Sequence, residues 1–451
     1  MRGERGIRQR GLLMAGQVAV LAVFLLVPIW YRLPAYLPIF PPLYPLRFLI
    51  LLPMLIAIVS WVLAGLPGLA ELRRDRPRAL WALSLLLLAL WAFASTNWAF
   101  MGETHPELAL ASALQFALVA LFALTIACAG PPPRALIAAL VAGLIWNGIL
   151  TVAQMERGGS LGLHALGEFP FSSWQQGTSV VQAGAVRIAR PYGLLPHPNL
   201  LAGALMIGLL AALAWVIDES RFRRWTSTAA FALGVYALLL TFSRAAWGAF
   251  LLSSLLALPL AWPSLRRNVR PLSIALASAF AAVILFALQY QPFLAARAGA
   301  GAEPIEMRSI ADRLVFTDFA LRSIGERPLQ GVGAGNFPWR TSYYIAETFY
   351  ELRGDQVHHV LLAAWAELGA VGLGLLLIAL GTGLYAALRR PAFVDRSPEQ
   401  IALIAIVFAL TAVGWLEHYP YTLLHFQAAW WGCLAAAMTH RPTIQSAAGS
   451  S

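Results

Sequence analysis

Two adjacent histidines stand where a polar stretch gives way to a long apolar run. His358 and His359 come directly before that run, and the acid Glu367 follows about two and a half helical turns deeper. The dipole of a helix favours the neutral form of a histidine at its N-terminus, and a neutral ring is what a general base requires. The other reading, an interfacial histidine that binds water or a lipid headgroup, remains open. At helical rise Glu367 lies roughly 13 Å from His358, too far for direct contact.

Glu367 is the only acid that we expect deep within an apolar run. Ionisable residues in such positions are candidates for function, here in a supporting role, with a hydrogen-bonded structural role as the alternative. Gly369 and Gly372 follow it, and their small size predicts that another helix approaches closely there.

The glycine-rich stretch from Gly331 to Phe337 resembles a phosphate-cradling loop, but no predicted strand precedes it. Its glycines, Gly331 and Gly333 among them, are better explained by a tight turn with close backbone approach. The eight histidines lack the spacing of metal ligands, so we expect no metal site. Ser243 lacks the flanking glycines of a nucleophile elbow, which argues against a catalytic triad.

These residues are embedded in a very apolar chain. Of 451 residues, 59% are hydrophobic and 12% charged, and the mean hydropathy is +0.69, which does not suit a soluble globular protein. Continuous apolar runs predict twelve transmembrane helices, and their lack of alternation argues against a barrel. The predicted spans are 11–31, 47–66, 79–99, 107–129, 134–153, 198–217, 226–243, 245–262, 272–290, 359–387, 401–417 and 422–439.

All 32 basic residues are arginine, and they form two sets. One set lies in short loops on a single side, which predicts that this side and both termini are cytoplasmic. Those arginines act as topology signals and anionic-lipid contacts, so the high pI does not indicate nucleic-acid binding. The second set falls on the outer side, where we expect it to bind an anionic group. It comprises Arg187, Arg190, Arg244, Arg308, Arg313, Arg322, Arg327, Arg340 and Arg353.

Two outer segments, 154–197 and 291–357, are longer than connectors need to be, which favours function over a passive cap. In the second, 309–326 is predicted to be an amphipathic helix with a Ser309 capping box and a stop at Pro328. Its apolar residues are expected to face the membrane or the bundle: Leu314, Phe316, Phe319, Ala320 and Ile324. The predicted organisation is 1–153 with five spans, the outer loop 154–197, 198–290 with four spans, the outer loop 291–357, 358–441 with three spans, and the tail 442–451.

From Arg187 to Gly372 the chain resembles the O-antigen ligase family of bacterial membrane glycosyltransferases, which also includes polysaccharide polymerases. His358, Gly369 and Gly372 fit the spacing of the family's histidine motif, and Glu367 stands where members often carry Glu. His359 departs from the usual Asn, Ser or Gln. Three upstream stretches match in order: Arg190-Pro191-Tyr192-Gly193 with Pro198-Asn199, Thr241-Phe242-Ser243-Arg244, and Pro328 to Phe337.

The resemblance implies an all-α, GT-C-like polytopic membrane protein with a large periplasmic loop between spans nine and ten. It also implies an inverting, metal-independent transfer of a glycan from an undecaprenyl-diphosphate carrier to an acceptor hydroxyl, without a cofactor, on the outer face of the bacterial inner membrane. Arg190 and Arg244 would bind the diphosphate, and His358 would accept the proton. Further candidates for substrate contacts are Arg187, Arg313, Arg340, His359, Asn199 and Tyr192, and Glu367, Gly331, Gly333, Gly369 and Gly372 would support the site.

Two rival functions stay open. The nearer is a glycan polymerase of the same family, in which the acceptor is another carrier-linked glycan instead of lipid A-core. The more distant is an anionic-lipid transporter or flippase, which would place polar residues along the membrane interior; here the charges gather at the outer surface, and no internal repeat is evident. The expected partners are therefore the lipid-linked donor, a lipid or glycan acceptor and membrane lipids, with no nucleic acid.

Overall fold

The computed structural model describes residues 2–32, 48–99, 105–297, 304–346, 354–389 and 396–439, with the side chains of 2–5 and 304–310 left aside. Several expectations therefore lie outside the described residues. These are the side chains of Arg2, Arg5, Arg308 and Ser309, the residues Arg353, Arg390 and Arg441, and the tail 442–451.

Each of the twelve predicted spans overlaps one helix, with bounds that differ by up to nine residues. These helices are α1 (Arg2–Leu26), α2 (Leu51–Leu63), α4 (Arg76–Ala94), α5 (Pro106–Ala129), α6 (Pro133–Arg157), α7 (Pro198–Val216), α8 (Arg221–Leu240), α9 (Arg244–Leu265), α10 (Val269–Arg297), α13 (Val360–Leu388), α14 (Pro398–Val413) and α16 (Leu424–Ala437). Within the described residues, eight helices are long and apolar enough to cross a membrane, and α2 and α14 are shorter apolar helices. The chain is a multi-pass membrane protein, as predicted, while the count of twelve crossings stays a prediction.

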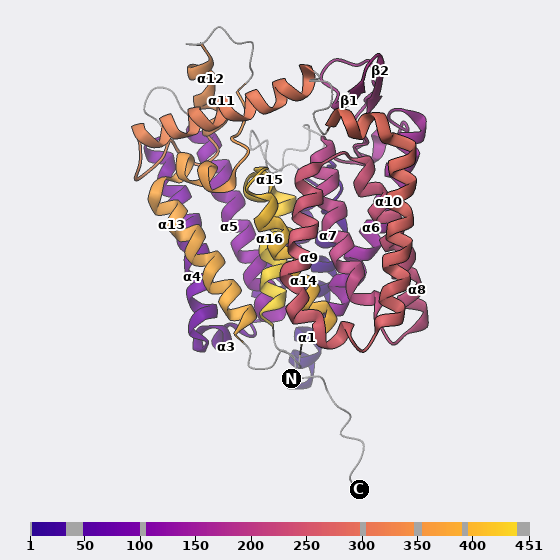
Figure 1. The fold of residues 1–451 in the computed structure, drawn as a ribbon. Coiled ribbons are helices and arrows are strands. Elements are labelled where there is room, and N and C mark those ends of the chain that lie inside the picture. The colour runs from indigo at the N-terminus through magenta and orange to yellow at the C-terminus, as the bar shows by residue number, and fades with distance from the viewer. Residues whose placement is uncertain are drawn as a thin grey trace.

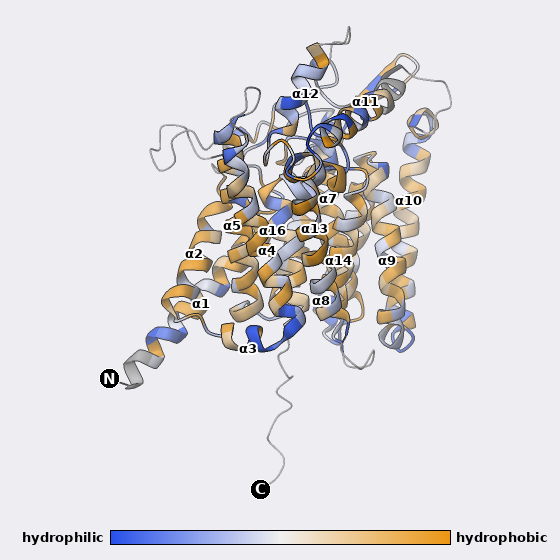
Figure 2. Ribbon diagram, turned by 90° about the vertical axis from the view of Figure 1, so that its left-hand side faces the viewer, coloured by the Kyte–Doolittle hydropathy of each residue, from blue (hydrophilic) through white to orange (hydrophobic). Residues whose placement is uncertain are grey.

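The helices pack side by side into one bundle, with apolar residues along its body and hydrophilic residues concentrated at its two ends (Figures 1 and 2). Helix α7 is the most enclosed of the eight, with 89% of its apolar window buried, and α10 is the least, with 11%. The chain therefore places α7 at the centre of the bundle and α10 at its margin. This matters for the site, because α7 begins, and α10 ends, at the same end of the bundle.

Short elements cover the two ends. At one end lie α11 (Pro304–Glu326), α12 (Phe337–Ala346) and the strands β1 (Val180–Ala183) and β2 (Val186–Ala189), and at the other lies α3 (Leu69–Arg74) (Figure 1). The remaining short elements are η2 (Ser95–Asn97), η3 (His164–Leu166) and α15 (Tyr419–Thr422). The strands form an antiparallel hairpin with Val180 opposite Ala189. The expectation of an all-α fold is wrong at this hairpin, whose four-residue strands are too short to give a clear alternating pattern.

Helix α11 lies across the end of the bundle (Figure 1). It ends at Glu326 as predicted, but it begins at Pro304, five residues before the predicted start at 309. Phe316, Phe319, Ala320 and Ile324 are buried, whereas Leu314 is 66% exposed. The bundle-facing alternative therefore holds for four of the five apolar side chains.

Helix α13 is interrupted at Gly369, where the backbone takes φ 67° and ψ −173°. The turn that follows α11 fits into this break: the amides of Val332 and Gly333 donate to the carbonyls of Ala366 and Glu367, both at 2.9 Å. A Cβ atom on Gly369 would lie 2.1 Å from the carbonyl oxygen of Leu329. The prediction of a helix approaching Gly369 is therefore wrong, because the close neighbour is this turn.

Gly331, in the turn after α11, allows the same close approach between this turn and α13. It has φ +69°, a conformation that glycine adopts without steric cost, and an added Cβ would lie 2.4 Å from the backbone of Glu367. At Gly372 an added Cβ would meet the side chain of Leu368, one turn earlier in the same helix. The glycine-rich stretch thus acts as a tight turn with close backbone approach, the interpretation that the sequence favoured.

Candidate functional site

A cavity of about 630 Å³ opens at the end of the bundle covered by α11 and the β-hairpin. Its walls come from segments far apart in the chain: the hairpin, the starts of α7 and α9, the end of α10, α11, and the residues before α13 and after α14. The lining residues with ionisable or ligand-binding side chains are Arg187, Arg190, His197, Asn199, Arg244, Arg297, Asp312, Arg313, Asp355, His358 and Glu417. The structure therefore brings together His358, Arg190 and Arg244, which are predicted to be catalytic.

Arg190 is a buried wall residue, 5% exposed, at the end of strand β2. Its Nε donates to the carbonyl of Thr241 at 2.6 Å and one terminal nitrogen donates to Ser179 Oγ at 2.9 Å. The other terminal nitrogen donates to Asn199 Oδ1 at 2.6 Å. Three of the five guanidinium N–H groups are thereby used, so Arg190 keeps at most two for a ligand.

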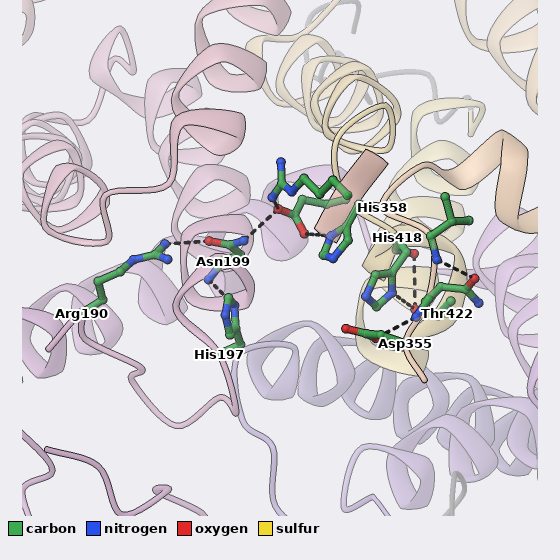
Figure 3. Close-up of polar contacts among 11 residues, drawn as sticks. Arg190, His197, Asn199, Asp355, His358, His418 and Thr422 are labelled. Atoms are coloured by element: carbon green, nitrogen blue, oxygen red, sulfur yellow. Dashed lines mark hydrogen bonds and ion pairs between the residues drawn. The ribbon is translucent and has the colours of Figure 1, made fainter. Parts of the chain in front are cut away.

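Asn199 links Arg190 to Glu417 through hydrogen bonds. It lies in the first turn of α7, and its Nδ2 donates to Glu417 Oε1 at 2.8 Å. His197 caps the same helix, since its Nδ1 accepts from the amide of Asn199 at 3.1 Å. Burial, and next the charge of Arg190, lower the pKa of His197 to about 3, so the ring remains neutral and able to accept. Figure 3 shows the hydrogen bond from Arg190 to Asn199, with His197 beside it.

The carboxylate of Glu417 binds three other side chains of the site. Glu417 follows the end of α14, its side chain is 5% exposed, and it accepts from Asn199, from Arg313 at 2.9 Å and from His358 Nδ1 at 3.3 Å. Burial raises the pKa of this carboxyl, but the hydrogen bond and charge of His358 and the charge of Arg313 outweigh burial and lower it to about 2. Glu417 is thus a carboxylate at neutral pH.

The Glu417 carboxylate fixes the tautomer of His358. A carboxylate only accepts hydrogen bonds, so Nδ1 of His358 carries a proton, and Nε2 is the nitrogen that can accept one in the neutral form of the ring. The His358 side chain is 25% exposed and lines the cavity. A neutral ring with one oriented basic nitrogen is suited to general base catalysis.

Arg244 and Arg297 line another part of the cavity and both bond to backbone carbonyls. Arg244, the first residue of α9, donates to the carbonyl of Arg297. The guanidinium group of Arg297 donates to the carbonyl of Phe242 at 2.7 Å. Phe242 has φ 52°, a left-handed conformation that costs a non-glycine residue about 1–2 kcal/mol. This strained turn between α8 and α9 directs the carbonyl of Thr241 at Arg190 and that of Phe242 at Arg297.

The cavity favours an anionic ligand. Five arginines line it against three carboxylates, and α7 and α9 begin at its wall, so their positive dipole ends lie beside it. Nε of Arg187 is buried and has no hydrogen-bond partner in the described part of the chain. Arg187 and Arg313, both predicted to bind substrate, line the cavity together with Asn199.

His359 lies beside the cavity and caps α13. Its Nδ1 accepts from the amide of Leu362 at 3.3 Å, and its ring packs edge-on against Trp415. Asn and Ser are the side chains most favoured at an N-cap, which gives a physical reason for the residues usual at this position in the resembling family. Here the histidine ring supplies the capping acceptor at this position.

Other predicted site residues lie elsewhere. Arg340 donates to Glu326 at 2.6 Å and to the hydroxyl of Tyr344, which joins α12 to α11 outside the cavity. Tyr192 is 6% exposed, and its hydroxyl accepts from the amide of Ser179 behind the wall. Both are positioned to hold the surrounding structure, and neither lines the cavity.

Glu367 is buried beneath the site. It accepts from Gln356 Nε2 at 2.8 Å and from the hydroxyl of Tyr421 at 3.2 Å. Gln356 is two residues before His358, so Glu367 anchors the segment that carries the histidine. This geometry fits the predicted supporting role, as do the backbone contacts of Gly331, Gly333 and Gly369 around the same residue.

Sequence reasoning missed Glu417, Arg297, Asp355 and Asp312. Glu417 lies at the edge of predicted span 401–417, where its apolar context gave no sign that Asn199, Arg313 and His358 converge on it. The position of Arg297 at the end of α10 was a usable signal, because it falls on the same side as Arg244. In the described part of the chain, no group of three or more His, Cys, Asp or Glu residues is arranged to hold a metal ion.

Comparison with known families matches one segment of the chain. Residues 229–377 match the model of the O-antigen ligase family. No curated protein sequence matches the chain. The matched segment includes Arg244, Arg313, His358, Gly369 and Gly372, while Arg190 and Glu417 complete the cavity from outside it. The match covers 149 of the 451 residues, so residues 229–377 are similar to the O-antigen ligase family over about a third of the chain.

Proposed function

We propose that this protein is a glycosyltransferase that moves a glycan from an undecaprenyl-diphosphate carrier to an acceptor hydroxyl on the outer face of the bacterial inner membrane. The observation that carries the proposal is the single cavity that holds five arginines and the oriented His358. A diphosphate-linked donor needs cations for its phosphates, and a hydroxyl acceptor needs a base. Both are present within one cavity.

The donor diphosphate would lie against Arg244, Arg187 and Arg297. Guanidinium groups present planar forks of donors that match phosphate oxygens, and they remain charged at all physiological pH values. As the bond to the sugar breaks, negative charge grows on the leaving diphosphate, and these groups stabilise it. Arg190, with at most two N–H groups left over, would contribute one edge to the ligand and keep the rest of the site in place.

His358 would accept the proton of the acceptor hydroxyl at Nε2. The hydroxyl oxygen then bonds to the anomeric carbon while the carbon–oxygen bond to the diphosphate breaks, and both electrons of that bond leave with the phosphate. Glu417 stabilises the imidazolium that forms, through the proton on Nδ1. Direct displacement of this kind inverts the anomeric carbon.

The nearer alternative is a polymerase that uses a second carrier-linked glycan as its acceptor. The donor groups and the base are common to both reactions, so they do not separate the two. The acceptor decides between them, with lipid A-core expected for a ligase. A transporter or flippase is a more distant alternative, because the polar residues that line this cavity gather at one end of the bundle.

The test is transfer by purified protein from a carrier-linked glycan, with lipid A-core and a second carrier-linked glycan offered as separate acceptors. We expect transfer to one acceptor to persist in excess EDTA, because arginine side chains replace the cation that would otherwise neutralise a diphosphate. Activity lost on chelation and restored by one divalent ion would contradict the leaving-group role of the arginines. Absence of transfer to either acceptor, with donor still bound, would favour the transporter.

A further inference from the structure

A second basic cavity lies at the other end of the bundle. It measures about 490 Å³ and is formed by the starts of α8 and α10, with Arg221, Arg224, Trp225, Thr228, Arg270, Pro271 and Ile274 as its lining. Helix α8 runs from this cavity to Thr241 and α10 runs from it to Arg297, both at the candidate site. A helix of twenty residues spans about 30 Å, so the two cavities are separate.

No acidic side chain lines this cavity to balance its positive charge. Three arginines line it and no acid does. Two acids precede this cavity in the chain. Glu219 is exposed and does not line the cavity, and Asp218 already binds Arg223 at 3.0 Å and Arg134 at 2.8 Å. No ion pair joins Arg221, Arg224 or Arg270 to any residue that the structure describes, so three guanidinium groups share one cavity without an acidic side chain in its lining.

The positions of these arginines add to the imbalance. Arg221 and Arg224 belong to the first turn of α8, and Arg270 is the second residue of α10. A helix N-terminus carries partial positive charge, so cations are disfavoured there and anions are favoured. An anion bound between the two helix starts would offset both the mutual repulsion of the arginines and the unfavourable dipoles.

The other walls of the cavity are apolar. Trp225 is 49% exposed and Ile274 is 39% exposed, and Pro271 lies between the basic and apolar parts. Helix α10 continues beyond Ile274 as the most exposed of the candidate spans, with only 11% of its apolar window buried. A ligand that fills this cavity therefore meets cationic groups at one side and a lipid-facing surface at the other.

We propose that this cavity is a binding site for a phosphate-bearing anion, with the phosphate held by Arg221, Arg224 and Arg270. The apolar wall favours the headgroup of an anionic membrane phospholipid over a soluble phosphate compound. Trp225 would lie at the level of the headgroups, where tryptophan is enriched in membrane proteins. The site would thus fix the protein margin formed by α8 and α10 to anionic lipid, independently of the reaction at the opposite end.

Topology signalling alone does not account for this arrangement. The positive-inside rule needs arginines in the loop but does not require them to converge on one cavity. Arg266 and Arg267 lie in the loop between α9 and α10, outside this cavity, and Arg267 Nε donates to the carbonyl of Pro263 at 2.9 Å. They provide matched controls, since they carry the same charge and precede Arg270 on the connection from α9 to α10.

Lipid retention tests the proposal. The full-length protein would be purified in detergent, mixed with phosphatidylglycerol or phosphatidylcholine, and examined by native mass spectrometry. The cavity variant combines Arg221→Ala, Arg224→Ala and Arg270→Ala. The control variant combines Arg266→Ala and Arg267→Ala with Arg73→Ala, an exposed arginine of α3 at the same end of the bundle. We expect the cavity variant to bind phosphatidylglycerol at least about tenfold more weakly, as for loss of charge-assisted hydrogen bonds, and the control variant to bind like the wild type.

Inorganic phosphate separates the two sources of the anion. If phosphate alone raises the unfolding temperature of the wild type but not of the cavity variant, the ligand is a soluble phosphate compound. If only phosphatidylglycerol does so, the ligand is a lipid. Equal weakening in both triple variants, or no stabilisation by either probe, would overturn the proposal. The single variant Arg270→Glu provides the same comparison should the triple variant not fold.

Discussion

His358 and Glu417 are joined side chain to side chain across 59 residues, with Nδ1 of the ring 3.3 Å from Oε2 of the carboxylate. The same carboxylate binds Arg313 and Asn199, and Asn199 in turn binds Arg190. The predicted base is therefore positioned by a network that includes one of the predicted phosphate-binding arginines. Loss of any member should affect activity in a way that identifies its role.

The first prediction concerns the base. His358→Ala should lower the transfer rate by about 10²–10⁴-fold, the range for a lost acid–base catalyst. Donor binding should survive, because the arginines hold the diphosphate. In the wild type the rate should fall in acid, since a protonated ring cannot accept a proton. Steady-state transfer and direct donor binding, measured on the same preparation, check both points.

The neighbouring histidine supplies the control. His359→Asn keeps an N-cap acceptor for the amide of Leu362 and should retain near wild-type transfer. If His359→Ala abolished transfer while His358→Ala did not, the base would be one residue away from our assignment. If both alanine variants were active, histidine base catalysis would be excluded.

The second prediction separates charge from hydrogen bonding at Glu417. Glu417→Gln preserves the size of the side chain and an oxygen for Asn199 or Arg313, but it removes the charge that stabilises the imidazolium. We expect kcat to fall by about 10²-fold or more, with little change in donor affinity. Glu417→Asp, which restores the charge on a shorter stem, should recover part of kcat. Equal activity of the Glu417→Gln variant and the wild-type protein would leave the carboxylate with a purely structural role.

The third prediction distinguishes the two arginines that the family resemblance treats alike. Arg190 has three hydrogen bonds to protein, whereas Arg244 is exposed at the start of α9. Arg190→Lys should reduce both kcat and thermal stability, because one ammonium cannot replace the fork that binds Thr241, Ser179 and Asn199. Arg244→Lys should weaken donor binding without a comparable loss of stability. The unfolding temperature and the donor Kd of each variant test this prediction. Equal changes in both quantities for Arg190→Lys and Arg244→Lys would contradict the different roles of the two arginines.

The positions of the apolar helices along the chain were largely predictable from the sequence, because long apolar runs separated by arginine loops are read directly from hydropathy. The β-hairpin was not predictable, because its strands of four residues are shorter than a recognisable alternating pattern. The early start of α11 at Pro304 was missed because Ser309 offers a plausible cap within the helix. Boundaries of this kind depend on tertiary contacts more than on local signals.

The site was partly predictable for a related reason. His358, Arg190 and Arg244 belong to motifs with recognisable spacing, and the structure brings them to one cavity. Glu417 has no such motif, and its partners come from α7, α11 and the start of α13, so only the fold reveals their convergence. Arg340 matched the expected type and side, but a nearby acid, Glu326, draws it away from the cavity.

The last prediction fixes the orientation of the protein in the membrane. Phe337 and Arg396, natural choices for labelling on sequence grounds, are 0% and 9% exposed, so cysteines there would react poorly. Trp174, in the segment before the β-hairpin, and Phe222, at the start of α8, are 78% and 79% exposed and lie near opposite ends of the bundle. In a background without Cys128 and Cys433, a membrane-impermeant maleimide applied to spheroplasts should label Trp174→Cys and leave Phe222→Cys unlabelled.

Permeabilised membranes provide the control for this experiment, since both cysteines should then react to a similar extent. The expected pattern follows from the arginine-rich loops at the α8 end, which the positive-inside rule assigns to the cytoplasm. Labelling of Phe222→Cys but not of Trp174→Cys in spheroplasts would reverse the orientation. The cavity that contains His358 would then face the cytoplasm, and a carrier-linked glycan presented on the outer face could not be its donor.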